Sequence, residues 1–146
     1  MSIDQIQQDL RSAQLARDEM KVSTLRLLLS EAKNAEIAKG GELTDQDLVS
    51  LIQKEVKKRK EASAAFRNGG REESAQKEEA EAQVLEGYLP QQLTTEELTK
   101  IVEESITELE AKGLQDMGKV MGVVMGKVAG RADGGQVSTL VKEKLA

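Results

Sequence analysis

Apolar residues recur at intervals of three and four positions along almost the whole chain, which is the spacing of one face of an α-helix. No stretch alternates apolar and polar residues over a length typical of a β-strand, and β-branched residues rarely cluster. The pattern therefore predicts an all-α fold of about four helices followed by about three. The expected helices or their apolar stripes lie at residues 3–13, 22–35, 44–66, 71–88, 94–109, 116–128 and 133–145.

Polar residues and glycines mark where these helices are expected to begin and end. Thr44 followed by Asp47 predicts a capping box, in which each side chain bonds the other residue's backbone N–H. Glycine ends helices because it adopts the left-handed conformation at little cost. The remaining expected caps and stops are Gly40 with Gly41, the segment 68–70, Thr94 or Thr95 with Glu97, Gly113, Asp116 and Asp133.

Pro90 is the only proline in the chain. Proline cannot continue a helix because it lacks the backbone N–H, and the residue before it avoids the helical conformation. The segment 89–92, which reads LPQQ, is therefore a natural boundary. We expect an N-terminal helical bundle at residues 1–92 and a C-terminal three-helix module at residues 93–146.

The composition excludes several kinds of chemistry. The chain has no Cys and no His, so it lacks a thiolate nucleophile, an imidazole base, zinc-type ligands and disulfides. We expect no catalytic residue, no metal ligand, no cofactor and no catalysis by the chain itself. Phe66 and Tyr88 are the only aromatic residues. Stacking of bases on exposed rings is thus excluded, and a nucleic acid must be recognised by its backbone and shape.

The same features suggest a cellular location. Absence of Cys fits a reducing cytosol, and no apolar run approaches the roughly 20 residues needed to cross a bilayer. Asp4 and Asp9 lie early in the chain, which argues against a secretory signal or a transit peptide. We expect a cytoplasmic protein without a membrane partner.

The net charge is −5, but the charges are distributed unevenly. Residues 53–60 carry five cations and one carboxylate, whereas residues 72–86 carry one cation and six carboxylates. The same contrast returns later, because residues 93–110 have one cation against six carboxylates and residues 111–146 have six cations against three. Two basic zones on an acidic protein are candidates for contact with phosphates.

The first basic zone is a candidate nucleic-acid site on the expected third helix. Lys54, Lys57 and Lys58 share one face of that helix because three and four residues separate them. The alternative is a solvated helix face, neutralised by Glu55 and Glu61 and by the acidic fourth helix folding back against it.

The second zone contains a row of glycines spaced by four residues, in the segment MGKVMGVVMGKVAGRADGG at 117–135. Glycine inside a helix costs about 1 kcal/mol relative to alanine, so three of them cost about 3 kcal/mol. A row without Cβ atoms admits another backbone closely, either a nucleic-acid strand or a neighbouring helix of the same chain. Three cations accompany the row and favour phosphates. The predicted site residues are Gly118, Lys119, Gly122, Gly126, Lys127, Gly130 and Arg131, with Met117, Met121 and Met125 expected as core filler.

Several blocks, in order, resemble one family. They are LRLLLSEAKNAEI at 25–37, QKEVKKRKEASAAFRNGGREESAQKEEAE at 53–81, EGYLPQQL at 86–93 and DMGKVMGVVMGKVAGRADGGQVSTLV at 116–141. The chain resembles YqeY-type proteins of the GatB/YqeY family over nearly its whole length. The resemblance implies a C-terminal module similar to the tail domain of GatB, an amidotransferase subunit whose tail contacts tRNA and whose chemistry lies elsewhere.

This resemblance implies a tRNA-associated accessory function, in connection with a glutamine-dependent tRNA amidotransferase or an aminoacyl-tRNA synthetase. The residues expected to bind tRNA are the seven site residues of the glycine segment and Lys54, Lys57 and Lys58. The alternative is a protein-interaction module, or a non-catalytic subunit of a carbon–nitrogen ligase with glutamine as amido-N-donor. An enzyme in its own right is disfavoured, because glutamine amidotransfer needs an activated nucleophile and the chain has no Cys.

Overall fold

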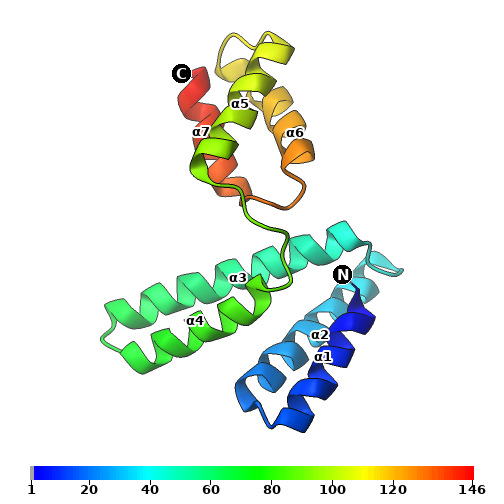
Figure 1. Ribbon diagram of the computed structural model, residues 1–146. Coiled ribbons are helices and arrows are strands. Elements are labelled where there is room, and N and C mark those ends of the chain that lie inside the picture. Colours follow the sequence, from blue (N-terminus) through cyan, green and yellow to red (C-terminus); the bar gives the residue numbers. More distant parts are fainter. Residues whose placement is uncertain (1) are drawn as a thin grey trace. The chain divides into compact units, whose positions relative to one another are not determined.

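The computed structural model describes residues 2–146, which form seven α-helices and one short 3₁₀ turn (Figure 1). The prediction of an all-α fold is confirmed. The elements are α1 (Ile3–Ala16), α2 (Glu19–Lys39), α3 (Asp45–Asn68), α4 (Glu72–Glu86), α5 (Thr95–Leu109), η1 (Leu114–Asp116), α6 (Met117–Val128) and α7 (Gly134–Leu145). Within residues 2–146, no helix combines the length and the apolarity that crossing a membrane requires.

The chain divides into two compact units, one ending at Leu89 and the other running from Pro90 to Ala146. The residues just after Pro90 are tied to the second unit. The Leu93 N–H donates to the Arg131 carbonyl at 2.8 Å, and the Gln92 side chain donates to the Gly130 carbonyl at 3.4 Å. The division therefore falls directly before Pro90, a few residues earlier than the expected boundary at 92. Whether each unit is stable alone stays a prediction.

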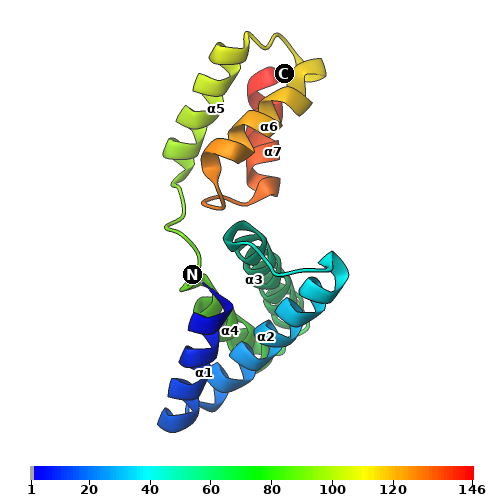
Figure 2. The same ribbon diagram turned by 90° about the vertical axis from the view of Figure 1, so that its right-hand side faces the viewer.

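The first unit consists of two helical hairpins, α1 with α2 and α3 with α4 (Figures 1 and 2). Their apolar faces meet in one core. Tyr88, just after α4, fastens the end of this unit because its hydroxyl donates to the Asp9 carboxylate on α1. Burial and this hydrogen bond raise the pKa of Tyr88. The buried core residues are Ile6, Leu25, Leu28, Leu48, Ile52, Val56, Ala82 and Leu85.

The expected helix ends of the first unit are confirmed in detail. Thr44 and Asp47 form the capping box at the start of α3. Gly40 follows α2 with φ of 79°, the left-handed conformation that favours glycine. Lys39, in the last turn of α2, donates to Asp47 at 2.6 Å. This hydrogen bond, together with those from Thr44, lowers the pKa of Asp47 to about 2.

The second unit packs α5, α6 and α7 against one another around a core rich in valine (Figure 2). A core of small β-branched side chains suits this short module, because the helices can approach closely. Leu109, expected in the apolar face, is 38% exposed at the end of α5. The buried residues are Leu98, Val102, Val120, Val124, Val128, Ala132, Val137, Val141 and Leu145.

Three helix ends in the second unit differ from the prediction, wholly or in part. Helix α5 ends at Leu109 rather than at Gly113, because Glu110 takes the left-handed conformation with φ of 51°. The N–H of Ala111 then closes the helix end by donating to the Ile106 carbonyl. Asp116 and Asp133 stand at the expected N-cap positions of α6 and α7, but neither side chain makes a capping hydrogen bond. The Asp116 carboxylate accepts instead from the Lys112 N–H at 2.9 Å.

Candidate nucleic-acid interface

Helix α6 has two opposite faces. Val120, Val124 and Val128 are fully buried on one of them, where they form the middle of the valine core. The three glycines of the row, Gly118, Gly122 and Gly126, are exposed on the other. This division follows from the period of 3.6 residues per turn, because two rows spaced by four residues and offset by two lie on opposite sides of the helix.

Within the second unit, no part of residues 90–146 covers the glycine row. A Cβ atom added at Gly118, Gly122 or Gly126 meets no atom within 4 Å. No helix of the second unit therefore covers these glycines, so packing against a neighbouring helix of that unit is wrong for all three. The row spans about 12 Å of bare helix surface, given the rise of about 1.5 Å per residue.

Gly130 does not belong to the row. Helix α6 ends at Val128, and Ala129 and Gly130 both take the left-handed conformation, with φ of 49° and 83°. The Gly130 carbonyl accepts the hydrogen bond from the Gln92 side chain. Gly130 thus lies in the turn that leads to α7 and outside the helical row, and its contact with tRNA stays a prediction.

The three cations of the segment are not equally available. Lys119 is exposed and makes no ion pair with any residue in the described range 2–146. Lys127 pairs with Glu108 of α5 at 2.9 Å, and the Arg131 Nε donates to the Gln91 carbonyl at 3.0 Å. Because surface ion pairs contribute only about 0–1 kcal/mol, Lys127 can exchange Glu108 for a phosphate at small cost. Lys119 can bind a phosphate without first breaking an ion pair with residues 2–146.

Methionine gives the glycine row an apolar border. Met117 and Met121 are partly buried against the core, as expected for core filler. Met125 differs, because 37% of its surface is exposed. It stands three residues after Gly122 and therefore next to it on the helix surface. The exposed face of α6 is thus bare backbone with a cation, Lys119, and a flexible apolar side chain beside it.

The competing basic zone on α3 is partly neutralised within the protein. Lys58 pairs with Glu55 at 3.3 Å, and Lys60 pairs with Glu86 of α4 at 2.6 Å. Lys54 and Lys57 make no ion pair with any of residues 2–146. Lys54 and Lys57 are therefore exposed cations that have no ion-pair partner among residues 2–146. Lys58 is partly neutralised by Glu55.

Arg59, in the middle of the same run, is only 8% exposed. Its guanidinium lies between Glu55, at 3.0 Å, and Glu81 of α4, at 3.3 Å, and both carboxylates are buried. The alternative of neutralisation by Glu55 and by the acidic fourth helix is thus confirmed at Arg59, although sequence reasoning did not place this cluster in the interior. The available signal was the apolar positions Val56 and Ala82 beside it, which mark the same faces as buried.

The far end of the α3–α4 hairpin has a second charge cluster. Arg67 donates to Glu72 at 3.0 Å and to Glu79 at 2.6 Å, and Ser63 also donates to Glu79. These bonds raise the pKa of Arg67 and lower those of Glu72 and Glu79. The acidic helix α4 thus folds back on the basic helix α3. Among residues 2–146, no three carboxylates gather in a way that would hold a metal ion.

Curated relatives of the chain come from fungi. A protein of Pyrenophora tritici-repentis named altered inheritance of mitochondria protein 41, mitochondrial, is 34% identical over 144 residues, covering 97% of this chain and 79% of the relative. Proteins of the same name in Lachancea thermotolerans and Vanderwaltozyma polyspora are 34% and 32% identical, over 62% and 73% of this chain. In these two the match spans 49% and 60% of the relative's own length.

These names contradict the expected cytoplasmic location, because each of them describes a mitochondrial protein. The inference was wrong in its premise, since a lack of Cys does not distinguish the cytoplasm from another compartment without disulfides. The family itself is settled by a broader match: the sequence model described as Yqey-like protein covers residues 3–145. The resemblance to YqeY-type proteins is confirmed, and the chain belongs to the YqeY family.

Proposed function

We propose that this protein is a tRNA-associated accessory protein that holds tRNA on the exposed face of α6. The observation that carries the proposal is the uncovered row of Gly118, Gly122 and Gly126. A glycine inside a helix costs about 1 kcal/mol relative to alanine, and no contact among residues 90–146 offsets this cost. A partner whose backbone approaches the bare helix surface accounts for it.

The charges beside the row favour a phosphate backbone as that partner. Lys119 is free, and Lys127 is held only by an exposed ion pair with Glu108. Arg131 already donates to a backbone carbonyl in the same unit. Phosphate contacts from such residues fix position without reading sequence. Recognition through shape and backbone suits a structured RNA, and the second unit offers no aromatic ring for stacking.

The link to tRNA in particular comes from the resemblance of the second unit to the tail domain of GatB. On this proposal the chain serves a glutamine-dependent tRNA amidotransferase or an aminoacyl-tRNA synthetase by binding, and the chemistry belongs to that enzyme. The alternative role, a protein-interaction module or non-catalytic subunit of a carbon–nitrogen ligase, predicts affinity for the enzyme and none for tRNA.

Titration with total tRNA at several salt concentrations tests the proposal. Lys119→Glu should weaken binding several-fold and reduce the slope of log affinity against log salt by about 1, since one phosphate contact is lost. Gly122→Leu adds bulk without changing charge. It should weaken binding through loss of close approach while the fold, followed by circular dichroism, is retained, because the site is open.

Lys57→Glu on α3 is the matched control, because it makes the same charge change at a free, exposed lysine. It should leave tRNA affinity nearly unchanged apart from a small non-specific loss. The proposed interface is wrong if folded Lys119→Glu and Gly122→Leu proteins bind tRNA normally while Lys57→Glu does not. Absence of tRNA binding by the unaltered protein would reject the function itself.

A further inference from the structure

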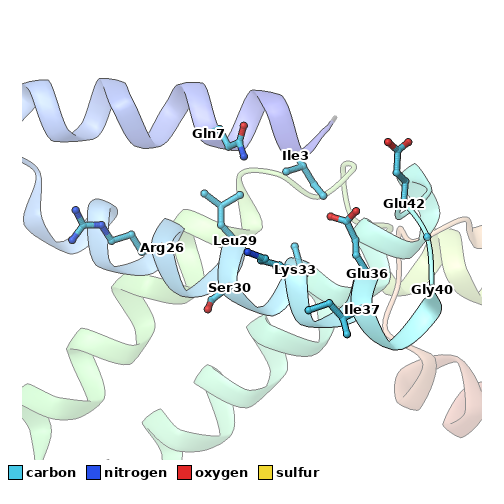
Figure 3. A pocket seen from close by; sticks show the side chains of 12 residues that line it. Ile3, Gln7, Arg26, Leu29, Ser30, Lys33, Glu36, Ile37, Gly40 and Glu42 are labelled. Carbon is cyan, nitrogen blue, oxygen red and sulfur yellow. The ribbon is translucent and has the colours of Figure 1, made fainter.

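A groove follows the outside of the α1–α2 hairpin in the first unit. It has a volume of about 840 Å³, is open to solvent and runs between the start of α1 and the part of α2 from Arg26 onward, as far as Gly40 and Gly41 (Figure 3). Ile3 and Leu29 line its apolar part. Ile37, near the end of α2, is 71% exposed, and Leu27, on the adjoining surface of the same helix, is 51% exposed. Ile37 is thus a large aliphatic side chain that the hairpin leaves uncovered in the groove.

The cations of this groove are also uncommitted. Arg26 and Lys33 line it from α2, and neither makes an ion pair with any part of the chain that the structure describes. They stand about two helical turns apart, or about 10 Å along the axis. Glu36 and Glu42 line the end of the groove near Gly40. The charge therefore changes sign along the groove, from positive around Arg26 and Lys33 to negative beyond.

We propose that this groove docks an amphipathic α-helix of a partner protein, whose apolar stripe covers Leu29 and Ile37 and whose carboxylates face Arg26 and Lys33. Helix-in-groove recognition uses apolar anchors spaced by three, four and seven residues. Helix α2 has 21 residues and offers a straight support of matching geometry, about 31 Å long. The proposal concerns the first unit only and does not depend on tRNA binding by α6.

The charge pattern favours an acidic helix over other occupants. A nucleic acid lying along the groove would bring its phosphates against Glu36 and Glu42 as well as against the cations, which is unfavourable at that end. A second copy of this chain would meet the groove as a two-fold pair, in which residue i of one copy faces residue j of the other, so the test below includes the oligomeric state. A helix with carboxylates at only one part of its surface can place them opposite Arg26 and Lys33. Its remaining surface then faces Glu36 and Glu42 without bringing a negative charge against them.

Two synthetic peptides of 21 residues, the length of α2, provide the probe. Both are constrained helices with the same leucine stripe. One has two glutamates seven residues apart beside the stripe, and its twin has lysines at those positions. We expect fluorescence anisotropy with the full-length protein to show the glutamate peptide binding about tenfold more tightly at low salt, because two attractive ion pairs replace two repulsive ones. Added salt should reduce the difference in affinity between the two peptides, because it screens the ion pairs.

Variants of the protein locate the peptide. Ile37→Asp should weaken the glutamate peptide about tenfold or more, and Lys33→Glu should remove the preference for it. Both residues are exposed, so circular dichroism should show an unchanged fold. Lys57→Glu is the control and should have no effect. The proposal is overturned if both peptides bind equally or neither binds, if folded Ile37→Asp retains binding, if RNA competes for the groove, or if the protein dimerises through Ile37.

Discussion

Helices α3 and α6 each contain a sequence feature typical of nucleic-acid contact, and the fold treats the two features in opposite ways. In α3, much of the basic run is used inside the first unit, because Arg59 is buried between two carboxylates and Lys58 and Lys60 have acidic partners. In α6, the glycine row is left open, with no atom near the missing Cβ positions. The conspicuous charges stabilise the protein, and the inconspicuous glycines face outward.

The difference shows which sequence pattern is the better evidence for a surface that binds a partner. A cluster of cations carries no information about where its counter-charges lie, because carboxylates from a distant part of the chain can neutralise it. A glycine row inside a helix has a stability cost that the sequence alone reveals. When the structure offers no internal compensation, the cost itself becomes evidence for an external partner.

The largest effect is expected from cutting the chain between the two units, which tests whether α3 and α6 can be compared as separate systems. Brief digestion with an unspecific protease should cleave first within residues 88–94 and leave both helices intact. Cuts should favour the residues before Gln91, since those after it are bonded to the turn at 130–131. Mass spectrometry identifies the fragments. Early cuts within 98–128 would show that the division is wrong.

Arg59→Ala should cause the largest loss of stability in the first unit. Removing this guanidinium leaves Glu55 and Glu81 buried without a counter-charge, at a cost of about 3–5 kcal/mol. Urea denaturation followed by circular dichroism measures the free energy of unfolding. Lys57→Ala, a free exposed lysine on the same helix, should change it by about 0.5 kcal/mol at most. If the two variants lower the free energy of unfolding equally, Arg59 does not stabilise the first unit more than the exposed Lys57 does.

Replacing Gly118, Gly122 and Gly126 with alanine should raise stability, by about 2–3 kcal/mol in total. Each added methyl group meets open space, so the gain in helix propensity is not opposed by a clash. Thermal unfolding gives the stability, and tRNA titration of the same variant should show weaker binding. A loss of stability would mean that the row is packed in solution and that the comparison with α3 fails.

A smaller effect is expected at acidic pH, at the far end of the α3–α4 hairpin. The pKa values of Glu72 and Glu79 are lowered by Arg67. Their contribution to stability is therefore fully present above the ordinary glutamate pKa and is lost as pH falls through the lowered values. Melting temperatures between about pH 6 and pH 3 should fall less steeply for Arg67→Met than for the unaltered protein. If the melting temperatures of the two proteins fall equally with pH, the ion pairs of Arg67 do not contribute to stability in solution.

Much of the fold follows from local sequence. The helix count, the capping box at Thr44 and the glycine stop at Gly40 depend on a few neighbouring residues and were predicted, and the cap at Thr94 was one of two candidates, with Thr95. The end of α5 was not, because Glu110 adopts a conformation that glycine normally supplies. The helix end is closed there by a local bond, from the Ala111 N–H to the Ile106 carbonyl, without the glycine on which the prediction relied.

The candidate site was predicted less completely, since its properties depend on distant partners. Spacing alone put Gly118, Gly122 and Gly126 on one face, but only the structure shows that this face is exposed. Spacing also placed Gly130 in the row, although the helix ends before it. The bond between Arg131 and Gln91 and the ion pair between Lys127 and Glu108 join residues 40 and 19 positions apart, so no local pattern could have shown which cation is free.

The hydrogen bond between Tyr88 and Asp9 has a practical consequence for spectroscopy. Tyr88 is the only tyrosine and the chain has no tryptophan, so its fluorescence and ultraviolet absorbance report from a single known place. That place is the last turn of the first unit, where burial and Asp9 raise the pKa of the phenol. The Tyr88 phenol will therefore ionise at a higher pH than an ordinary tyrosine while α1 and α4 stay together. When they separate, its pKa will return to the ordinary value. An unlabelled sample thus has a built-in optical signal for the opening of one unit, whereas circular dichroism records the helices of both.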